Sequence, residues 1–286
     1  MHTHSRFCLY MPPVSTIKTY REMVDYAAAH GITKLETLNI LDLSTPNLEI
    51  ARDLKAYADE KGVTFPCVSV GLSLVDDDRE ARIEEVKRYA DIAKILGSPY
   101  LHHTIALNFS EPEKIAKNFE LYYQRGIAAV REIFDYAGAL GIRSIYEDQG
   151  FVFNGKATFA RFLKDVERNV GVVADFGNIQ FADEDVEDFI PAFADQIVHV
   201  HAKDYLVTPV GSREKLPGEY TSRGGNYLQA CLIGEGSVHT DAAFLALKAI
   251  GYQGAVALES DPIGPDEEAS FCANLEAVTR HIDTYL

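Results

Sequence analysis

GVVADFGNIQFADEDVEDFIPAFADQIVHVHAKDY, residues 171–205, is the stretch of sequence that decides the fold. It opens with a short apolar run that ends at Asp175, continues with a helical pattern at about 183–190, and closes with a second apolar run over 196–201 that ends at His201. A strand, a helix and a second strand in this order form a βαβ unit with parallel strands. The first run is almost entirely apolar, as expected of a strand that is buried on both faces.

The same alternation of short β-rich runs and amphipathic helical patterns extends over the whole chain of 286 residues. The predicted strands are 5–11, 33–38, 64–70, 98–105, 142–147, 171–175, 196–201 and 254–259. The predicted helices are about 16–30, 47–62, 77–96, 111–139, 156–167, 183–190, 239–250 and 266–284. Eight βα units in a row favour parallel strands that close into a (β/α)8 barrel, the TIM barrel of the α/β class. One such barrel often occupies about 200–250 residues or more, so we expect residues 1–286 to form a single domain.

The charge of the chain excludes some classes of partner. Its formal net charge is -16. A protein that binds a nucleic-acid duplex needs Lys and Arg side chains to displace the counterions of the phosphates. The acidic balance therefore argues against nucleic acid and against anionic membranes as partners.

Cysteine usage and hydropathy bear on the cellular compartment. The four cysteines, Cys8, Cys67, Cys231 and Cys272, lie far apart and form no C-x-x-C pair. This spacing argues against a thiolate zinc site and against a disulfide framework. No apolar run approaches the roughly 18 residues of a membrane span, and no segment reads as a signal peptide. We therefore expect a cytoplasmic protein.

Four consecutive predicted strands end in a residue that can bind a metal ion. They end at Glu147, Asp175, His201 and Glu259. Active sites of α/β barrels lie at the C-terminal ends of the strands, so these side chains should converge at the mouth of the barrel. Three carboxylates that close would repel one another unless a cation neutralised them. The sequence therefore predicts one divalent metal ion, and the mixed oxygen and nitrogen donors suit Mn, Mg, Co or Zn.

The strings around these four residues resemble a known family. They are YEDQG around Glu147, VVADFGN around Asp175, VHVHAKDY around His201, and LIGEGSVHTDAAFLALKAIGYQGAVALE, which ends at Glu259. Over essentially its whole length the chain resembles the sugar phosphate isomerase/epimerase superfamily of xylose-isomerase-like TIM barrels, which contains the D-tagatose and D-psicose 3-epimerases. The resemblance implies that these four residues bind one divalent ion, and that the protein forms a dimer or tetramer.

Two positions depart from the ketose 3-epimerases. Three residues beyond the metal-binding Asp, those enzymes carry a His that contacts substrate, and this chain has Asn178. Six residues beyond the metal-binding His they carry an Arg, and this chain has Val207. These versions look more like the broad sugar phosphate isomerase/epimerase branch, or inosose isomerases, and they leave the substrate open.

Several further residues are candidates for binding a substrate. Besides Asn178 these include Lys203, which could hold a hydroxyl, carboxylate or phosphate group, and Asp204, which could orient Lys203. The alternative for this pair is a surface salt bridge. The irregular stretch 205–236 contains Arg213, Lys215 and Arg223 and should lie over the same face as a lid.

Two strands earlier in the chain also end in polar residues. Glu36 ends a predicted strand and could bind a sugar hydroxyl or play a structural part. His102 and His103 end another strand, and because side chains alternate along a strand only one should point into the mouth. We assign His103 to the substrate site. His199 lies two residues before His201, on the same side of the strand but deeper, and should support it.

The proposed chemistry is proton transfer. A metal ion that binds the carbonyl and a neighbouring hydroxyl group would stabilise the enediolate of a ketose, an inosose or a related small molecule, phosphorylated or not. Glu147 and Glu259 would then remove and return the proton on opposite faces of the substrate. This describes a metal-dependent isomerase or epimerase of carbohydrate metabolism, with manganese among the candidate metals.

Three other functions use the same barrel. An inosose-type dehydratase would use the same metal and a base to expel water. A zinc-dependent apurinic endonuclease would need further histidine ligands, and this chain has Asn178 at one of their expected positions. A sugar-binding protein without activity would not need both proton-transferring carboxylates.

Overall fold

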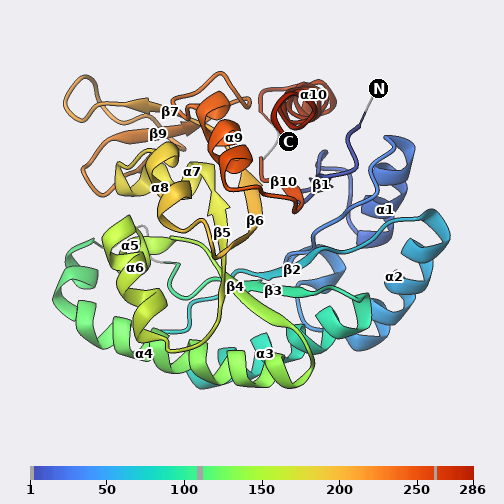
Figure 1. Cartoon of the computed structure of the whole chain (residues 1–286), viewed down its shortest axis with the longest axis horizontal. Helices are drawn as coiled ribbons and strands as arrows, with labels where there is room; N and C mark the ends of the chain where they lie inside the picture. Colours follow the sequence, from blue (N-terminus) through green and yellow to red (C-terminus); the bar gives the residue numbers. More distant parts are fainter. Residues whose placement is uncertain (1–2, 108–111, 261–262) are drawn as a thin grey trace.

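The structure, a computed structural model, describes residues 3–107, 112–260 and 263–286. Short parallel strands form its centre, and α1, α2, α3 and α4 lie outside them in sequence order (Figure 1). Among the described residues, no helix has both the length and the apolar character that crossing a bilayer requires.

Seven parallel strands pair in the order β1-β10-β6-β5-β4-β3-β2. Their bounds are β1 (Phe7–Leu9), β2 (Cys67–Val70), β3 (Tyr100–His103), β4 (Arg143–Tyr146), β5 (Gly171–Asp175), β6 (Ile197–Ala202) and β10 (Val256–Leu258). Each lies within or overlaps a predicted strand, and the α/β barrel class is confirmed. The order also brings the end of the chain beside its beginning, because β10 pairs with β1.

The predicted strand 33–38 lies between β1 and β2, but it forms isolated bridges instead of a continuous ladder. The parallel bridges join Leu35 to Leu9, and Lys34 and Thr37 to Thr64 and Val68. Backbone hydrogen bonds run in both directions, from the Leu9 amide to the Lys34 carbonyl and from the Glu36 amide to the Leu9 carbonyl. This segment therefore closes the ring between the two edges of the seven-stranded sheet.

The helices follow the predicted alternation, with short additional turns on the C-terminal side of the strands. The α-helices are α1 (Tyr20–Ala29), α2 (Leu48–Lys61), α3 (Arg79–Leu96), α4 (Pro112–Ala139), α5 (Gly150–Phe153), α6 (Lys156–Asp165), α7 (Phe176–Ile179), α8 (Val186–Ala192), α9 (Thr240–Ala249) and α10 (Glu267–Tyr285). Two 3-10 turns are η1 (Leu41–Leu43) and η2 (Gln180–Ala182). The predicted start of α4 at residue 111 lies outside the described residues.

Local chemistry explains where a typical helix begins and ends. The side chain of Asn47 accepts hydrogen bonds from the amides of Glu49 and Ile50 at the start of α2. Gly62 ends the same helix with a φ of 72°, in the left-handed region that a residue with a side chain rarely adopts.

The core has two parts, one between the strands and the helices and one inside the barrel. The larger part contains most of the buried apolar residues. Two small clusters, around Cys8 and Ala257 and around Ile145 and Val173, are separate from it. Residues two apart on a strand share a face, so Val173 lies on the face of Asp175, and Ile145 on that of Glu147. The interior therefore changes from apolar residues to polar ones towards the C-terminal ends of the strands.

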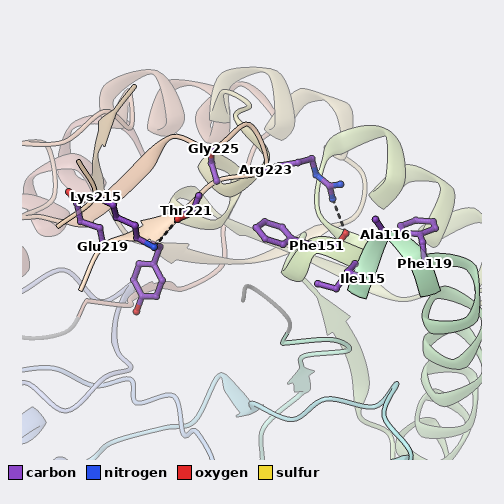
Figure 2. Close-up of a pocket in the computed structure, with 11 residues that line it drawn as sticks. Ile115, Ala116, Phe119, Phe151, Lys215, Glu219, Thr221, Arg223 and Gly225 are labelled. Carbon is purple, nitrogen blue, oxygen red and sulfur yellow. Dashed lines mark hydrogen bonds between the residues drawn. The ribbon is translucent and has the colours of Figure 1, made fainter. Parts of the chain in front are cut away.

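The stretch 205–236, predicted as an irregular loop, contains a small antiparallel sheet. Its strands are β7 (Tyr205–Thr208), β8 (Tyr220–Thr221) and β9 (Tyr227–Ala230), in the order β7-β9-β8. Tyr205 and Leu228 are buried together with Phe181 beneath it. Part of this segment faces α4 and α5 across a cavity (Figure 2). The strands are too short for their alternating apolar residues to stand out from a loop in the sequence.

Candidate functional site

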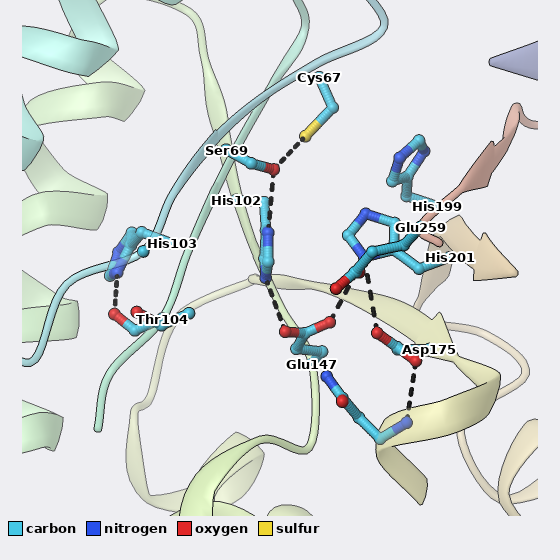
Figure 3. Close-up of polar contacts among 12 residues, drawn as sticks. Cys67, Ser69, His102, His103, Thr104, Glu147, Asp175, His199, His201 and Glu259 are labelled. Atoms are coloured by element: carbon cyan, nitrogen blue, oxygen red, sulfur yellow. Dashed lines mark hydrogen bonds and ion pairs between the residues drawn. The ribbon is translucent and has the colours of Figure 1, made fainter. Parts of the chain in front are cut away.

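Four side chains meet at the C-terminal ends of β4, β5, β6 and β10 (Figure 3). They belong to Glu147, Asp175, His201 and Glu259, and one possible ligand atom from each lies within 4.8 Å of the others. We call these four residues the metal-type cluster. His201 Nδ1 is 2.9 Å from Glu259 Oε2, 3.5 Å from Glu147 Oε2 and 3.8 Å from Asp175 Oδ2. The structure thus brings together the four residues that the sequence singled out.

The cluster is buried although it contains three carboxyl groups. His201 is 0% exposed, Asp175 1% and Glu147 6%, and only the Glu259 side chain retains more exposure, at 21%. Glu147 Oε2, Asp175 Oδ2 and His201 Nδ1 are buried and make no well-aligned hydrogen bond among the described residues. A buried polar atom that lacks a hydrogen bond costs up to about 1–3 kcal/mol, less where an ion pair offsets part of it. Three such atoms around one point form a donor set that suits a divalent cation.

Asp175 is oriented by the start of a helix. Its Oδ1 accepts hydrogen bonds of 2.9 Å from the amides of Gly177 and Asn178, so it caps the short helix α7. Because Oδ1 is used in this way, Oδ2 is left to face His201 and the rest of the cluster. Capping residues of this kind hold a carboxylate in one rotamer.

His201 is held from below by Glu36. Its Nε2 lies 3.2 Å from Glu36 Oε1. In the neutral ring that binds a metal, Nε2–H would donate to Glu36 and the lone pair of Nδ1 would face the carboxylates of the cluster. Glu36 is 0% exposed and also accepts hydrogen bonds from the Ser69 hydroxyl at 2.5 Å and from His199 Nε2 at 2.6 Å. From the sequence, Glu36 could either bind a sugar hydroxyl or play a structural part. The structure encloses it behind His201, where both of its oxygens have partners, as a structural part requires.

Opposing effects shift the pKa values in the cluster. Burial alone would lower the pKa of His201, but the surrounding carboxylates, Glu36 foremost, raise it well above its ordinary value. Burial raises the pKa of Glu147 and that of Glu259. Burial would also raise the pKa of Asp175, but the charge of Lys203, the contact with His201 and the hydrogen bond from the Asn178 amide together outweigh it and lower that pKa. The two glutamates are therefore the carboxyl groups of the cluster that are shifted towards neutral pH.

Lys203 reaches the cluster from the end of β6. Its ammonium Nζ is 2.5 Å from Glu259 Oε1 and 3.2 Å from Asp175 Oδ2, and it donates to Asn178 Oδ1 at 3.4 Å. Its stem lies over Gly177, where an added Cβ would stand 2.7 Å from Lys203 Cδ. The surface salt bridge considered as the alternative role of Lys203 is therefore not what the structure contains. Lys203 and Asn178 both border the cluster.

Asp204 has partners other than Lys203. Its carboxylate accepts hydrogen bonds from four backbone amides, those of Tyr205, Gly234, Gly236 and Val238, at 2.8 to 3.1 Å. Asp204 as a whole residue is 2% exposed. From the sequence, we expected Asp204 to orient Lys203 or to bind substrate. The structure shows it fastening the segment 234–238 to the end of β6.

The two histidines at the end of β3 face in different directions. His102 faces the cluster, whereas His103, which we assigned to the substrate site, faces away from it. His103 contacts Tyr146 Oη through Nε2 at 2.8 Å and the Thr104 carbonyl through Nδ1 at 3.1 Å, away from the cluster (Figure 3). His102 faces the cluster, with Nε2 3.6 Å from Glu147 Oε1. Burial, helped by the charge of His201, lowers the pKa of His102 to about 3, so this ring is neutral at neutral pH.

Other residues beside the cluster were missed. The ring of Tyr10, one residue after β1, lies 4.9 Å from that of His201 between centroids. Ser69 links Glu36 to His102, since its Oγ is 3.0 Å from His102 Nδ1. The signal that identifies them is parity: each belongs to the same inward-facing series of its strand as the deeper interior residues Cys8 and Cys67.

The basic residues of the segment 205–236 do not contact the cluster. Arg213 pairs with Glu219, and Lys215 Nζ donates to Thr221 Oγ1 at 2.8 Å. Arg223 donates to the carbonyl oxygens of Phe151, at 3.0 Å, and Asn154, at 3.2 Å. Their contacts stabilise the small sheet and its approach to α5.

This geometry defines the class of protein: a parallel α/β barrel with a buried metal-type cluster at its mouth. A family model described as xylose isomerase-like TIM barrel matches residues 24–278, and the chain belongs to this family. It is similar to a xylose isomerase domain protein from Planctomyces limnophilus, with a TM-score of 0.77 and 19% identity over 100% of this chain and 99% of that one.

Two other solved structures have the same fold. A D-allulose 3-epimerase from Methylomonas sp., in complex with D-allulose, has a TM-score of 0.72 and 19% identity over 100% of this chain and 99% of that one. A xylose isomerase-like TIM barrel protein from Mycobacterium smegmatis, in complex with magnesium, has a TM-score of 0.69 and 17% identity over 93% of this chain and 89% of that one.

Asp204→Ala should loosen the segment 234–238, because four backbone amides lose their shared acceptor. Hydrogen bonds to charged groups contribute about 1.5–3 kcal/mol each and are not additive, so we expect a loss of about 2–4 kcal/mol in the free energy of unfolding. Hydrogen–deuterium exchange should become faster at Gly234, Gly236 and Val238. Asp204→Asn keeps one acceptor oxygen, so its stability and its exchange rates should lie between those of the wild type and the alanine variant. Unchanged exchange in the alanine variant would contradict this role.

Proposed function

We propose that this protein is a metal-dependent sugar isomerase or epimerase that acts by proton transfer next to a carbonyl group. The observation that carries the proposal is the metal-type cluster, in which three buried donor atoms that make no well-aligned hydrogen bond among the described residues surround one point. Its surroundings are polar and its outermost carboxylate, Glu259, retains exposure. These properties suit a small, hydroxyl-rich substrate that approaches the mouth of the barrel.

Glu147, Asp175, His201 and Glu259 would hold one divalent ion, Mn, Mg, Co or Zn, through three carboxylate oxygens and one imidazole nitrogen. When bound, the ion would supply Lewis-acid polarisation of the substrate carbonyl. Asp175 and His201 are each fixed by a second contact, Asp175 by the amides that it caps and His201 by Glu36. These two residues would bind the ion without exchanging protons with the substrate.

Glu147 and Glu259 would carry the protons. Their pKa values are raised by burial, which brings a carboxyl group closer to the pH at which it can both take and return a proton. They extend from β4 and β10, two strands that are not neighbours in the sheet. One glutamate would remove the proton next to the carbonyl, giving an enediolate, and the other would return a proton to the opposite face.

Lys203 and Asn178 would contact the substrate beside the cluster. The ammonium of Lys203 lies within 3.2 Å of two cluster carboxylates, so it also offsets part of their negative charge. A substrate hydroxyl or anionic group next to Glu259 would lie within its reach. We propose further that the closed ring and its helices act as a single catalytic domain.

The comparisons support a sugar as substrate. Solved structures that share the fold include a D-psicose 3-epimerase in the presence of D-fructose and an L-ribulose 3-epimerase, at 17% identity each. Both names specify epimerisation at carbon 3 of a ketose. We carry the reaction type to this chain, and we leave the particular sugar to experiment.

The direct test is exchange of a carbon-bound proton. Metal-loaded protein should wash deuterium from deuterated water into one carbon of a ketose or inosose in a panel that also includes their phosphates, as followed by NMR. Glu147→Gln and Glu259→Gln keep an oxygen donor but remove the base, so exchange should fall by about 10²–10⁴-fold.

Metal content must be measured in parallel on the same samples. If both glutamine variants retain the ion and exchange at the wild-type rate, these residues do not transfer the proton. A product that has lost water would instead identify an inosose-type dehydratase that uses the same cluster.

Glu36→Gln should weaken metal binding by about 10–100-fold, because the carboxylate that accepts from His201 Nε2–H is lost. Affinity for Mn²⁺ or Zn²⁺ can be measured by competition with a chromophoric chelator. Glu80→Gln is a matched control, since the Glu80 side chain is 88% exposed. Equal metal affinity in the Glu36 and Glu80 variants would show that Glu36 does not support His201.

A further inference from the structure

A large cavity lies next to the smaller one that borders the cluster. It has a volume of about 890 Å³ and lies between α4, α5 and the segment of the small sheet around β8 (Figure 2). A smaller cavity of about 260 Å³ is lined by Lys203 and Glu259 of the site. Tyr220 lines both cavities, so they are neighbours.

The two cavities differ in size and in chemistry. The smaller one is bordered by charged groups and suits a single sugar unit. The larger one is walled mainly by apolar and aromatic side chains, those of Ile115, Phe119, Phe151 and Tyr220. Cavities of about 300–1,000 Å³ with such walls bind drug-sized ligands. A free sugar placed there would lose hydrogen bonds to water and gain few in return.

Two basic side chains border the larger cavity without a carboxylate partner among the described residues. Lys215 donates to the Thr221 hydroxyl, and Arg223 donates to backbone carbonyls and to Asn154. Arg213 of the same segment, by contrast, is paired with the carboxylate of Glu219. The cavity therefore favours an aromatic group that carries an acidic oxygen.

We propose that the substrate is a sugar conjugate: its sugar part occupies the smaller cavity, and an attached aromatic group with a phenolic or carboxylic oxygen occupies the larger one. This inference rests on the proposed function, because it takes the cluster to be where the sugar reacts. It adds a second binding region, formed by α4, α5 and β8, that a free ketose would leave empty.

The position of Phe151 connects this region to the site. Phe151 lies in α5, four residues after Glu147, so a group stacked on its ring would be close to the strand end that carries a proposed proton-transferring residue. The guanidinium of Arg223 lies 5.9 Å from the centre of this ring and donates to the Phe151 carbonyl. An aromatic ligand would thus meet a wall that is already fixed in place.

The test uses three probes on the metal-loaded protein: methyl, phenyl and 4-carboxyphenyl β-D-glucopyranosides, with affinities measured by calorimetry. Burial of a phenyl ring should make the phenyl glucoside bind about 10–100-fold more tightly than the methyl glucoside. The 4-carboxyphenyl glucoside should bind more tightly still, and Lys215→Ala should remove that additional gain only.

Ala116→Trp should fill the cavity without removing any core contact, because Ala116 is an exposed residue of α4 that lines it. This variant should bind the phenyl and methyl glucosides equally, with unchanged metal content. Leu121→Trp is the control, since Leu121 is 50% exposed on the same helix and does not line the cavity. Phe151→Ala should likewise abolish the tighter binding of the phenyl glucoside relative to the methyl glucoside.

The outcomes separate this inference from the proposed function. If a ketose exchanges its proton but wild-type protein binds the phenyl and methyl glucosides alike, the conjugate inference fails and the proposed function stands. If the aromatic preference is present but no ketone in the panel exchanges, the proposed function fails. If Ala116→Trp, and not Leu121→Trp, changes the mass of the protein in solution, the cavity is an interface between copies and the inference is overturned.

Discussion

The crowding of three carboxyl groups around one imidazole is the constraint on which the rest of the site depends. His201 Nδ1 lies within 3.8 Å of oxygens from Glu147, Asp175 and Glu259, in surroundings from which water is largely excluded. One oxygen from each carboxylate also lies within 4.8 Å of the others, and charges of one sign at such separations repel strongly when the local dielectric constant is low. One ammonium, that of Lys203, offsets part of this charge, and the remainder accounts for a site that suits a divalent cation.

The barrel supports this crowded arrangement by holding two of the donors, Asp175 and His201, through separate contacts. A helix start fixes Asp175, and the buried Glu36 fixes His201, with Ser69 and His199 completing the hydrogen bonds of Glu36. Below this polar layer the interior is apolar, and outside the strands a continuous core packs against the helices. Stability is therefore supplied by the wall of the barrel, while the mouth is kept polar and ordered for chemistry.

The sequence predicted the parallel strands and the four converging residues, because a buried parallel strand is a mainly apolar run and its last polar residue stands out. The sequence did not identify which of two adjacent side chains points into the mouth of the barrel, as for His102 and His103. Glu36 was noticed, but its role depends on His199 and His201, which are more than 160 residues away in the chain. The anchoring of Gly234 and Gly236 by Asp204 is likewise a contact between backbone and side chain that no local pattern marks.

The central claim is that the four residues of the cluster hold one metal ion in contact with Glu147 and Glu259, and anomalous X-ray diffraction from crystals grown with Mn²⁺ tests it most directly. The account predicts one strong anomalous peak at about 2.0–2.3 Å from His201 Nδ1 and from one oxygen of each carboxylate, distances typical of oxygen and nitrogen ligands of first-row metals. Lys203 Nζ should lie outside this shell. A strong peak elsewhere with none at the cluster, or an ammonium that remains between Asp175 and Glu259 at saturating Mn²⁺, would contradict it.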